Sequence, residues 1–128
     1  MKFFITSVLL FFLCTSSTTA ADFNKGLEAA KRGDFATSFK EWEPLANQGD
    51  SSAQFNLGRM YQYGYGLPKD NNKALYWFKK SAEEGDERAQ YKLGYFYDLG
   101  VGVPEDNVLA VYWYNKAAEQ GHDMAQSY

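Results

Sequence analysis

The chain has 128 residues, with 13 lysines and arginines against 16 aspartates and glutamates, and a net charge of −3. That length leaves room for one small domain, and the acidic balance disfavours non-specific binding to nucleic acid or to anionic membranes. Aromatic residues make up 18% of the chain, which is enough to fill the core of a small domain.

Residues 1–21 have the pattern of a secretory signal peptide. Lys2 supplies a positive start, residues 3–13 form a mostly apolar run, and small residues lead to an exit at Ala20 and Ala21. Cleavage after either alanine fits the pattern. The apolar run is shorter than the roughly 20 residues that a membrane-spanning helix needs, so no stable membrane insertion is expected after cleavage.

Two alternatives for this segment stay open. It could remain as an uncleaved anchor, or Cys14 could carry a lipid, although the bulky residues 11–13 before it are unusual for a lipoprotein signal. Cys14 is the only cysteine, so the cleaved chain would have no disulfide. It would keep 12 basic and 16 acidic residues, a net charge of −4 with the histidine neutral.

Residues 22–50 predict a first, degenerate helix pair. Residues 23–32 would form its first helix, and residues 32–34 would make a short connection. The segment 33–50 aligns with residues 69–86 further along the chain, and it keeps the aspartate, alanine and glycine of that later unit. With its short Gly-Asp-Phe junction, this degenerate first pair resembles a tetratricopeptide unit more closely than the two copies that follow do.

From residue 51 the sequence repeats with a period of 36. Residues 51–86 and 87–122 are identical at 17 of 36 aligned positions. Residues 123–128 begin a fourth copy with another Ala-Gln, so the array looks cut in mid-unit. Since repeated units bury their apolar faces only by stacking, the predicted fold is all-α, an α-solenoid of antiparallel helix pairs.

Each repeat predicts two helices. In residues 52–63, apolar positions recur every four residues at Ala53, Leu57 and Tyr61, with Met60 alongside. In residues 71–84, the corresponding face carries alanines, Trp77 and Phe78. Small residues would let the helices approach closely, and the large aromatic ones would fill the gaps between them.

The ends of these helices carry recognisable signals. Gly85 fits the left-handed stop of a helix, and Asp50 and Asp86 fit the N-cap of the helix that follows each of them. The connector between the two helices of a unit reads Gly64-Tyr-Gly-Leu-Pro-Lys-Asp70 and, one repeat later, Gly-Val-Gly-Val-Pro-Glu-Asp. It follows a helix and lacks the remaining residues of a dinucleotide or phosphate-binding loop. The lysine is replaced by glutamate in the second copy, so a turn between helices is the favoured interpretation.

The shared frame, Ala-Gln-x-x-Leu-Gly-x-x-Tyr-x-x-Gly-x-Gly-x-Pro-x-Asp-Asn, continuing through Ala, Tyr-Trp, Lys and Ala-Glu-x-Gly, resembles the Sel-one-like repeat (SLR) family. This family is a relative of the tetratricopeptide repeat. The resemblance is strong over residues 51–122 and weak over residues 23–50. Some secreted members are rich in cysteine, with one disulfide per repeat, and this chain lacks those cysteines.

No residue pattern predicts catalysis, a cofactor or a metal. His122 is the only histidine, and it stands at the capping slot of Asp86, which suggests a surface loop residue. The carboxylate pairs at 83–84 and 105–106 lie at repeat ends and loops rather than across a cleft.

The resemblance implies a binding groove lined by the first helices of successive units. Positions outside the shared frame would face it, and aromatic residues and arginines there suit a peptide or protein partner. The alternative is that Phe55 and Tyr91 only pack against neighbouring helices. The candidates are Phe55, Arg59, Gln62, Tyr63, Arg88, Tyr91, Tyr95 and Asp98.

These observations predict an exported, non-enzymatic protein–protein interaction module. Export, together with a family common in Gram-negative bacteria, favours the periplasm or secretion. Two alternatives remain. The resemblance to cysteine-rich relatives described as penicillin-binding or weakly β-lactam-hydrolysing suggests one, although no Ser-x-x-Lys motif is present. A truncated repeat array with no independent role is the other.

Overall fold

The structure is a computed structural model that describes residues 20–122, 124 and 125. The predicted signal segment lies outside the described residues except for its last two alanines, as does most of the predicted fourth copy. Six helices and no strand are found in this part of the chain, and their bounds are α1 (Phe23–Lys31), α2 (Phe35–Asn47), α3 (Ser51–Tyr63), α4 (Asn71–Glu83), α5 (Glu87–Leu99) and α6 (Asn107–Glu119).

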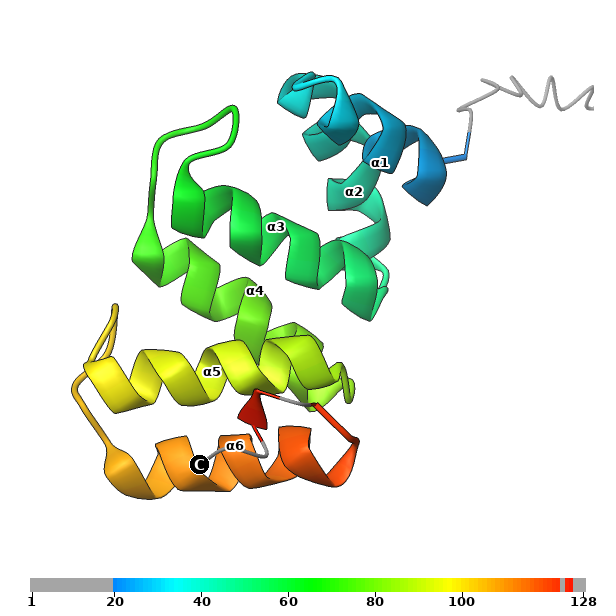
Figure 1. The fold of residues 1–128 in the computed structure, drawn as a ribbon. Helices are drawn as coiled ribbons and strands as arrows, with labels where there is room; N and C mark the ends of the chain where they lie inside the picture. Colours follow the sequence, from blue (N-terminus) through cyan, green and yellow to red (C-terminus); the bar gives the residue numbers. More distant parts are fainter. Residues whose placement is uncertain (1–19, 123, 126–128) are drawn as a thin grey trace, which may run out of the picture.

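The helices stack as three antiparallel pairs, each helix packing on the next one along the chain (Figure 1). The α1–α2, α3–α4 and α5–α6 pairs follow one another from one end of the molecule to the other. The predicted all-α solenoid is therefore confirmed. Within the described residues, no helix is both long and apolar enough to cross a membrane.

An aspartate begins every helix. Its carboxylate accepts backbone N–H groups of the first turn, which have no partner within the helix, and such a cap stabilises a helix by about 1 kcal/mol. The predicted caps at residues 50 and 86 are among the six, which are Asp22, Asp34, Asp50, Asp70, Asp86 and Asp106.

The Gly-x-Gly connector is a turn that also touches the preceding unit. Gly64 ends α3 with φ 70° and ψ 40°, a left-handed conformation that favours glycine. Gly66 has φ 72°, and a Cβ built on it would lie 2.5 Å from the Cβ of Phe35 at the start of α2. The second glycine is thus required both by the backbone turn and by close contact between units.

The repeated glutamine of the Ala-Gln pair links neighbouring units. Gln54 Nε2 in α3 donates to the carbonyl oxygen of Ala46 at 3.0 Å, near the end of α2. Gln90 in α5 makes the same bond to Ala82 of α4 at 3.2 Å. Each carbonyl lies in the last turn of a helix and also accepts a backbone N–H from the following glycine, so the glutamine adds a second donor that ties the units together.

Apolar side chains gather in two clusters on either side of α3. Ala53, Leu57 and Met60 pack with Trp42 against α2. The second cluster, between α3, α4 and α5, is composed of Phe55, Ala74, Phe78, Ala82, Ala89, Leu93 and Phe96. Each interior helix therefore buries two faces, because it has a neighbour on each side.

The two-cluster core differs from the predicted single apolar faces. Tyr61 packs with the second cluster rather than with Ala53 and Leu57, and Trp77 packs with the first cluster rather than with Phe78. Helices α3 and α4 meet closely because Gly58 of α3 leaves space for the ring of Phe78 of α4, which is fully buried. A Cβ at residue 58 would lie only 2.6 Å from that ring.

Candidate protein-binding site

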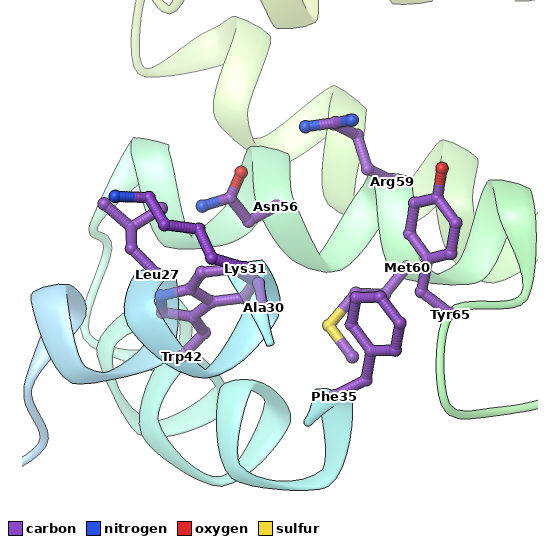
Figure 2. A pocket seen from close by; sticks show the side chains of 9 residues that line it. All are labelled: Leu27, Ala30, Lys31, Phe35, Trp42, Asn56, Arg59, Met60 and Tyr65. Atoms are coloured by element: carbon purple, nitrogen blue, oxygen red, sulfur yellow. The ribbon is translucent and has the colours of Figure 1, made fainter. Parts of the chain in front are cut away.

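Two hollows open between the first helices of successive pairs. The α1–α3 hollow has a volume of about 340 Å³ (Figure 2). Its lining comes from both helices of the first pair and from α3 and the connector after it, and consists of Leu27, Ala30, Lys31, Phe35, Trp42, Asn56, Arg59, Met60 and Tyr65.

The α3–α5 hollow has a volume of about 460 Å³. Tyrosines and cations dominate it, and its lining is Phe55, Gln62, Tyr63, Arg88, Tyr91, Lys92, Tyr95, His122 and Met124. Helix α3 contributes to both hollows through different residues, so the two hollows lie on either side of this helix.

Six of the eight residues predicted to face a groove line the α3–α5 hollow. The other two do not. Arg59 lines the neighbouring α1–α3 hollow. Asp98 accepts a hydrogen bond from the hydroxyl of Tyr114 in α6 at 3.3 Å and is not part of either lining.

Phe55 and Arg88 form one wall of the α3–α5 hollow. Phe55 is only 7% exposed, and its ring centroid lies 5.7 Å from that of Phe78, so it belongs to the core as well as to the hollow. The guanidinium of Arg88 lies 4.4 Å from the centroid of the Phe55 ring. Asp86 holds it there through a 2.6 Å ion pair, and this hydrogen bond raises the pKa of Arg88.

Two further contacts connect side chains of the α3–α5 hollow. Lys92 Nζ of α5 donates to the hydroxyl oxygen of Tyr63 of α3 at 2.7 Å, which bridges the two helices. Tyr91 stacks on His122, with ring centroids 4.8 Å apart and planes at 19°. His122 is therefore half-buried against a tyrosine, whereas the sequence suggested a surface loop residue.

Two buried polar atoms in this hollow have no hydrogen-bond partner among the described residues. They are Gln62 Oε1 and His122 Nδ1, and the one other such atom in this part of the chain is Gln54 Oε1. An unsatisfied buried polar atom costs about 1–3 kcal/mol. Both residues line the hollow, so a small movement of either side chain would bring its unsatisfied atom to a ligand there.

Asn56 gives the α1–α3 hollow a polar side chain, although its amide atoms are not among the buried unsatisfied ones. It is 8% exposed, and its amide makes no hydrogen bond to any described residue. Arg59 is exposed and has no ion-pair partner in the described part of the chain. Tyr65, in the connector, stacks on Phe35 with centroids 5.1 Å apart.

Sequence reasoning missed Asn56 and the lining contributed by the degenerate first unit. The available signal was the difference between copies, because Asn56 stands opposite Lys92 in the repeat alignment and Tyr65 opposite Val101. His122 and Met124 follow the last complete helix, and the repeat aligns them with Asp86 and Arg88, which could have indicated their place beside the hollow. Over the ranges that the structure describes, no three potential metal ligands lie together.

A family model described as the Sel1 repeat matches residues 51–86 and 87–122, more than half of the chain. The chain belongs to the Sel1 repeat family. Its predicted resemblance to Sel-one-like repeats is thereby confirmed. Sel1 repeat proteins typically act as scaffolds for protein interactions.

Solved structures of relatives share the stacking. A Sel1 repeat protein from Oxalobacter formigenes is 35% identical, with a TM-score of 0.76 over 82% of each chain. Cysteine-rich protein B of Helicobacter pylori is 21% identical, with a TM-score of 0.68 over 87% of this Sel1 repeat chain and 97% of that one. At this identity the second comparison shows the shared fold alone.

Among curated proteins, the chain is similar to the ERAD-associated E3 ubiquitin-protein ligase component HRD3A of Arabidopsis thaliana. The two are 36% identical over 61 residues, which is 47% of this chain and 9% of HRD3A. The chain spans about a tenth of the length of the curated relatives that it matches.

Proposed function

We propose that this Sel1 repeat protein is an interaction module that binds a segment of another polypeptide between its first helices. The α3–α5 hollow is the main site, and the α1–α3 hollow extends it. The observation that carries the proposal is the lining of the α3–α5 hollow. It combines three tyrosines with two cations and two unpartnered buried polar atoms.

The chemistry of this lining suits a protein ligand. Tyrosine and arginine supply much of the binding energy in protein interfaces, because they combine a large contact area with a polar end. The hollow is also pre-arranged, since the Arg88–Asp86 and Lys92–Tyr63 contacts already fix its cations. Pre-arrangement lowers the entropic cost of ordering these side chains when a ligand binds.

We further propose that the protein works after export, in the periplasm or outside the cell. The charge and the apolar run of residues 1–21 support this. The mass of the mature chain purified from its own host, compared with that of the full sequence, tests it. A mature N-terminus at Ala21 or Asp22 is expected, and an intact Met1 on the functional protein would contradict it.

Substitution of hollow residues tests the binding proposal. A partner captured by the wild-type protein in its native extract should be lost from Tyr95→Ala and Tyr63→Ala. Tyr76→Ala is the matched control, because Tyr76 is 53% exposed on α4 and lines neither hollow. Equal capture by all three variants would refute the proposed site.

A further inference from the structure

We infer that the bound segment is acidic and extended, and that it crosses α3 from one hollow to the other. This inference rests on the proposed function and specifies its ligand. It follows from the charges, the unpartnered amides and the spacing of the groups along α3.

The lining of the hollows has the opposite charge to the protein as a whole. The chain carries more acidic than basic residues, 16 against 13. Yet every charged side chain that lines either hollow is a cation, namely Lys31, Arg59, Arg88 and Lys92. The linings of the two hollows are therefore locally positive on an acidic molecule, which favours an anionic partner there.

Two of these four cations are available for a ligand. Lys31 is paired with Glu28 at 2.9 Å, and Arg88 is paired with Asp86 at 2.6 Å. Arg59 has no acidic partner among the described residues, and Lys92 donates only to the neutral hydroxyl of Tyr63. Each hollow thus offers one cation that a carboxylate could pair with.

Each hollow also offers a polar side chain that lacks a partner. The amide of Asn56 in the α1–α3 hollow makes no bond to the described residues, and Gln62 Oε1 in the α3–α5 hollow is buried and unsatisfied. A carboxamide both donates and accepts hydrogen bonds. The N–H and C=O of a peptide bond can pair with both carboxamides once the Gln62 side chain turns toward the ligand.

The spacing of these groups fits an extended chain. Asn56 and Gln62 are six residues apart on α3, about 9 Å along the helix axis. An extended strand covers that length in about three residues. Tyrosines line the α3–α5 hollow beside the cations. In a segment that alternates acidic and bulky apolar side chains, the acidic ones could pair with the cations and the apolar ones could pack on the tyrosines.

Fluorescence anisotropy with labelled decapeptides tests the inference on the purified chain. One peptide alternates aspartate and tyrosine, and its matched control has asparagine in place of every aspartate. The aspartate peptide should bind roughly tenfold more tightly, a ratio that corresponds to one hydrogen-bonded ion pair. Its affinity should fall as salt rises, because salt screens exposed charges. A ten-nucleotide oligothymidylate serves as the polyanion control and should bind much more weakly.

Substitutions locate the interaction. Arg59→Gln and Lys92→Gln should each weaken the aspartate peptide several-fold, while Lys79→Gln, on an exposed part of α4, should leave it unchanged. Asn56→Leu should weaken binding without lowering the melting temperature. That readout separates a ligand contact from a structural role.

Several results would overturn the inference. They are equal binding of the asparagine peptide, equal binding of the oligonucleotide, equal loss with Lys79→Gln, or no binding of the aspartate peptide at about 1 mM. If capture of the native partner depends on Tyr95 but not on Arg59 or Lys92, the acidic ligand is wrong and the proposed function stands. If capture is independent of Tyr95 as well, the proposed function fails too.

Discussion

The close approach of α3 and α4 makes a sharp stability prediction for Gly58→Ala. A methyl group at this position would lie 2.6 Å from two atoms of the Phe78 ring, whereas carbon atoms in contact are normally about 3.5–4 Å apart. The ring would have to move by about 1 Å. It is fully buried between Phe55 and Phe96, with centroids 5.7 and 5.5 Å away, so it has little room to do so.

The expected magnitude is the balance of two effects. Overpacking of a core costs about 1–3 kcal/mol. Replacement of glycine by alanine inside a helix stabilises the folded state by about 1 kcal/mol, because alanine has the higher helix propensity. The net loss should therefore be about 1 kcal/mol, or roughly 5 °C in melting temperature for a domain of this size.

Urea unfolding followed by circular dichroism measures this loss, and two controls interpret it. Comparison of Lys79→Ala with Lys79→Gly, at an exposed α4 position, calibrates the helix effect without any clash. Phe78→Leu combined with Gly58→Ala should destabilise by less than the sum of the single changes, because the smaller side chain makes room for the methyl group. The proposed close packing would be refuted if Gly58→Ala stabilised the protein by as much as Lys79→Ala is more stable than Lys79→Gly.

Two further stability predictions concern a connector and an ion pair. Gly100→Ala should cost about 1–2 kcal/mol in urea unfolding, because its φ of 66° is left-handed, and unchanged stability would contradict this. The pKa of Glu41 is lowered from its ordinary 4.5, first by the backbone N–H of Asp22 and then by Lys25. Its stabilisation is thus present above pH 4.5 and is lost as pH falls through the lowered pKa. Glu41→Gln should therefore lose less stability than wild type between pH 6 and pH 3, and parallel curves would refute the role of this carboxylate.

The sequence was sufficient to predict the solenoid, because repetition at 36 residues imposes the same packing twice. Ala53 and Ala89 are both fully buried, and Gly64 and Gly100 end their helices with nearly the same backbone angles. A pattern found in two copies is therefore strong evidence for a structural role. By the same reasoning, Lys69 of the first connector is not needed for the fold, because glutamate replaces it in the second copy.

The division of the surface into two hollows could not be predicted from one helix face. Successive residues on a helix turn by about 100°, so α3 presents Asn56 and Arg59 toward α1 but Gln62 and Tyr63 toward α5. The first unit matches the later ones only weakly, so alignment does not reveal what α1 and α2 contribute. The unpartnered amide of Asn56 emerges only once its neighbours are placed.

The most direct test of the binding site is photo-crosslinking to the native partner. A photoreactive phenylalanine analogue would be placed at position 62 or 91, in the α3–α5 hollow, or at position 76 on α4. The proposed function predicts a covalent adduct with the same partner from positions 62 and 91 and none from position 76. An adduct from position 76 alone would show that the partner binds the other face of the solenoid and would contradict the account.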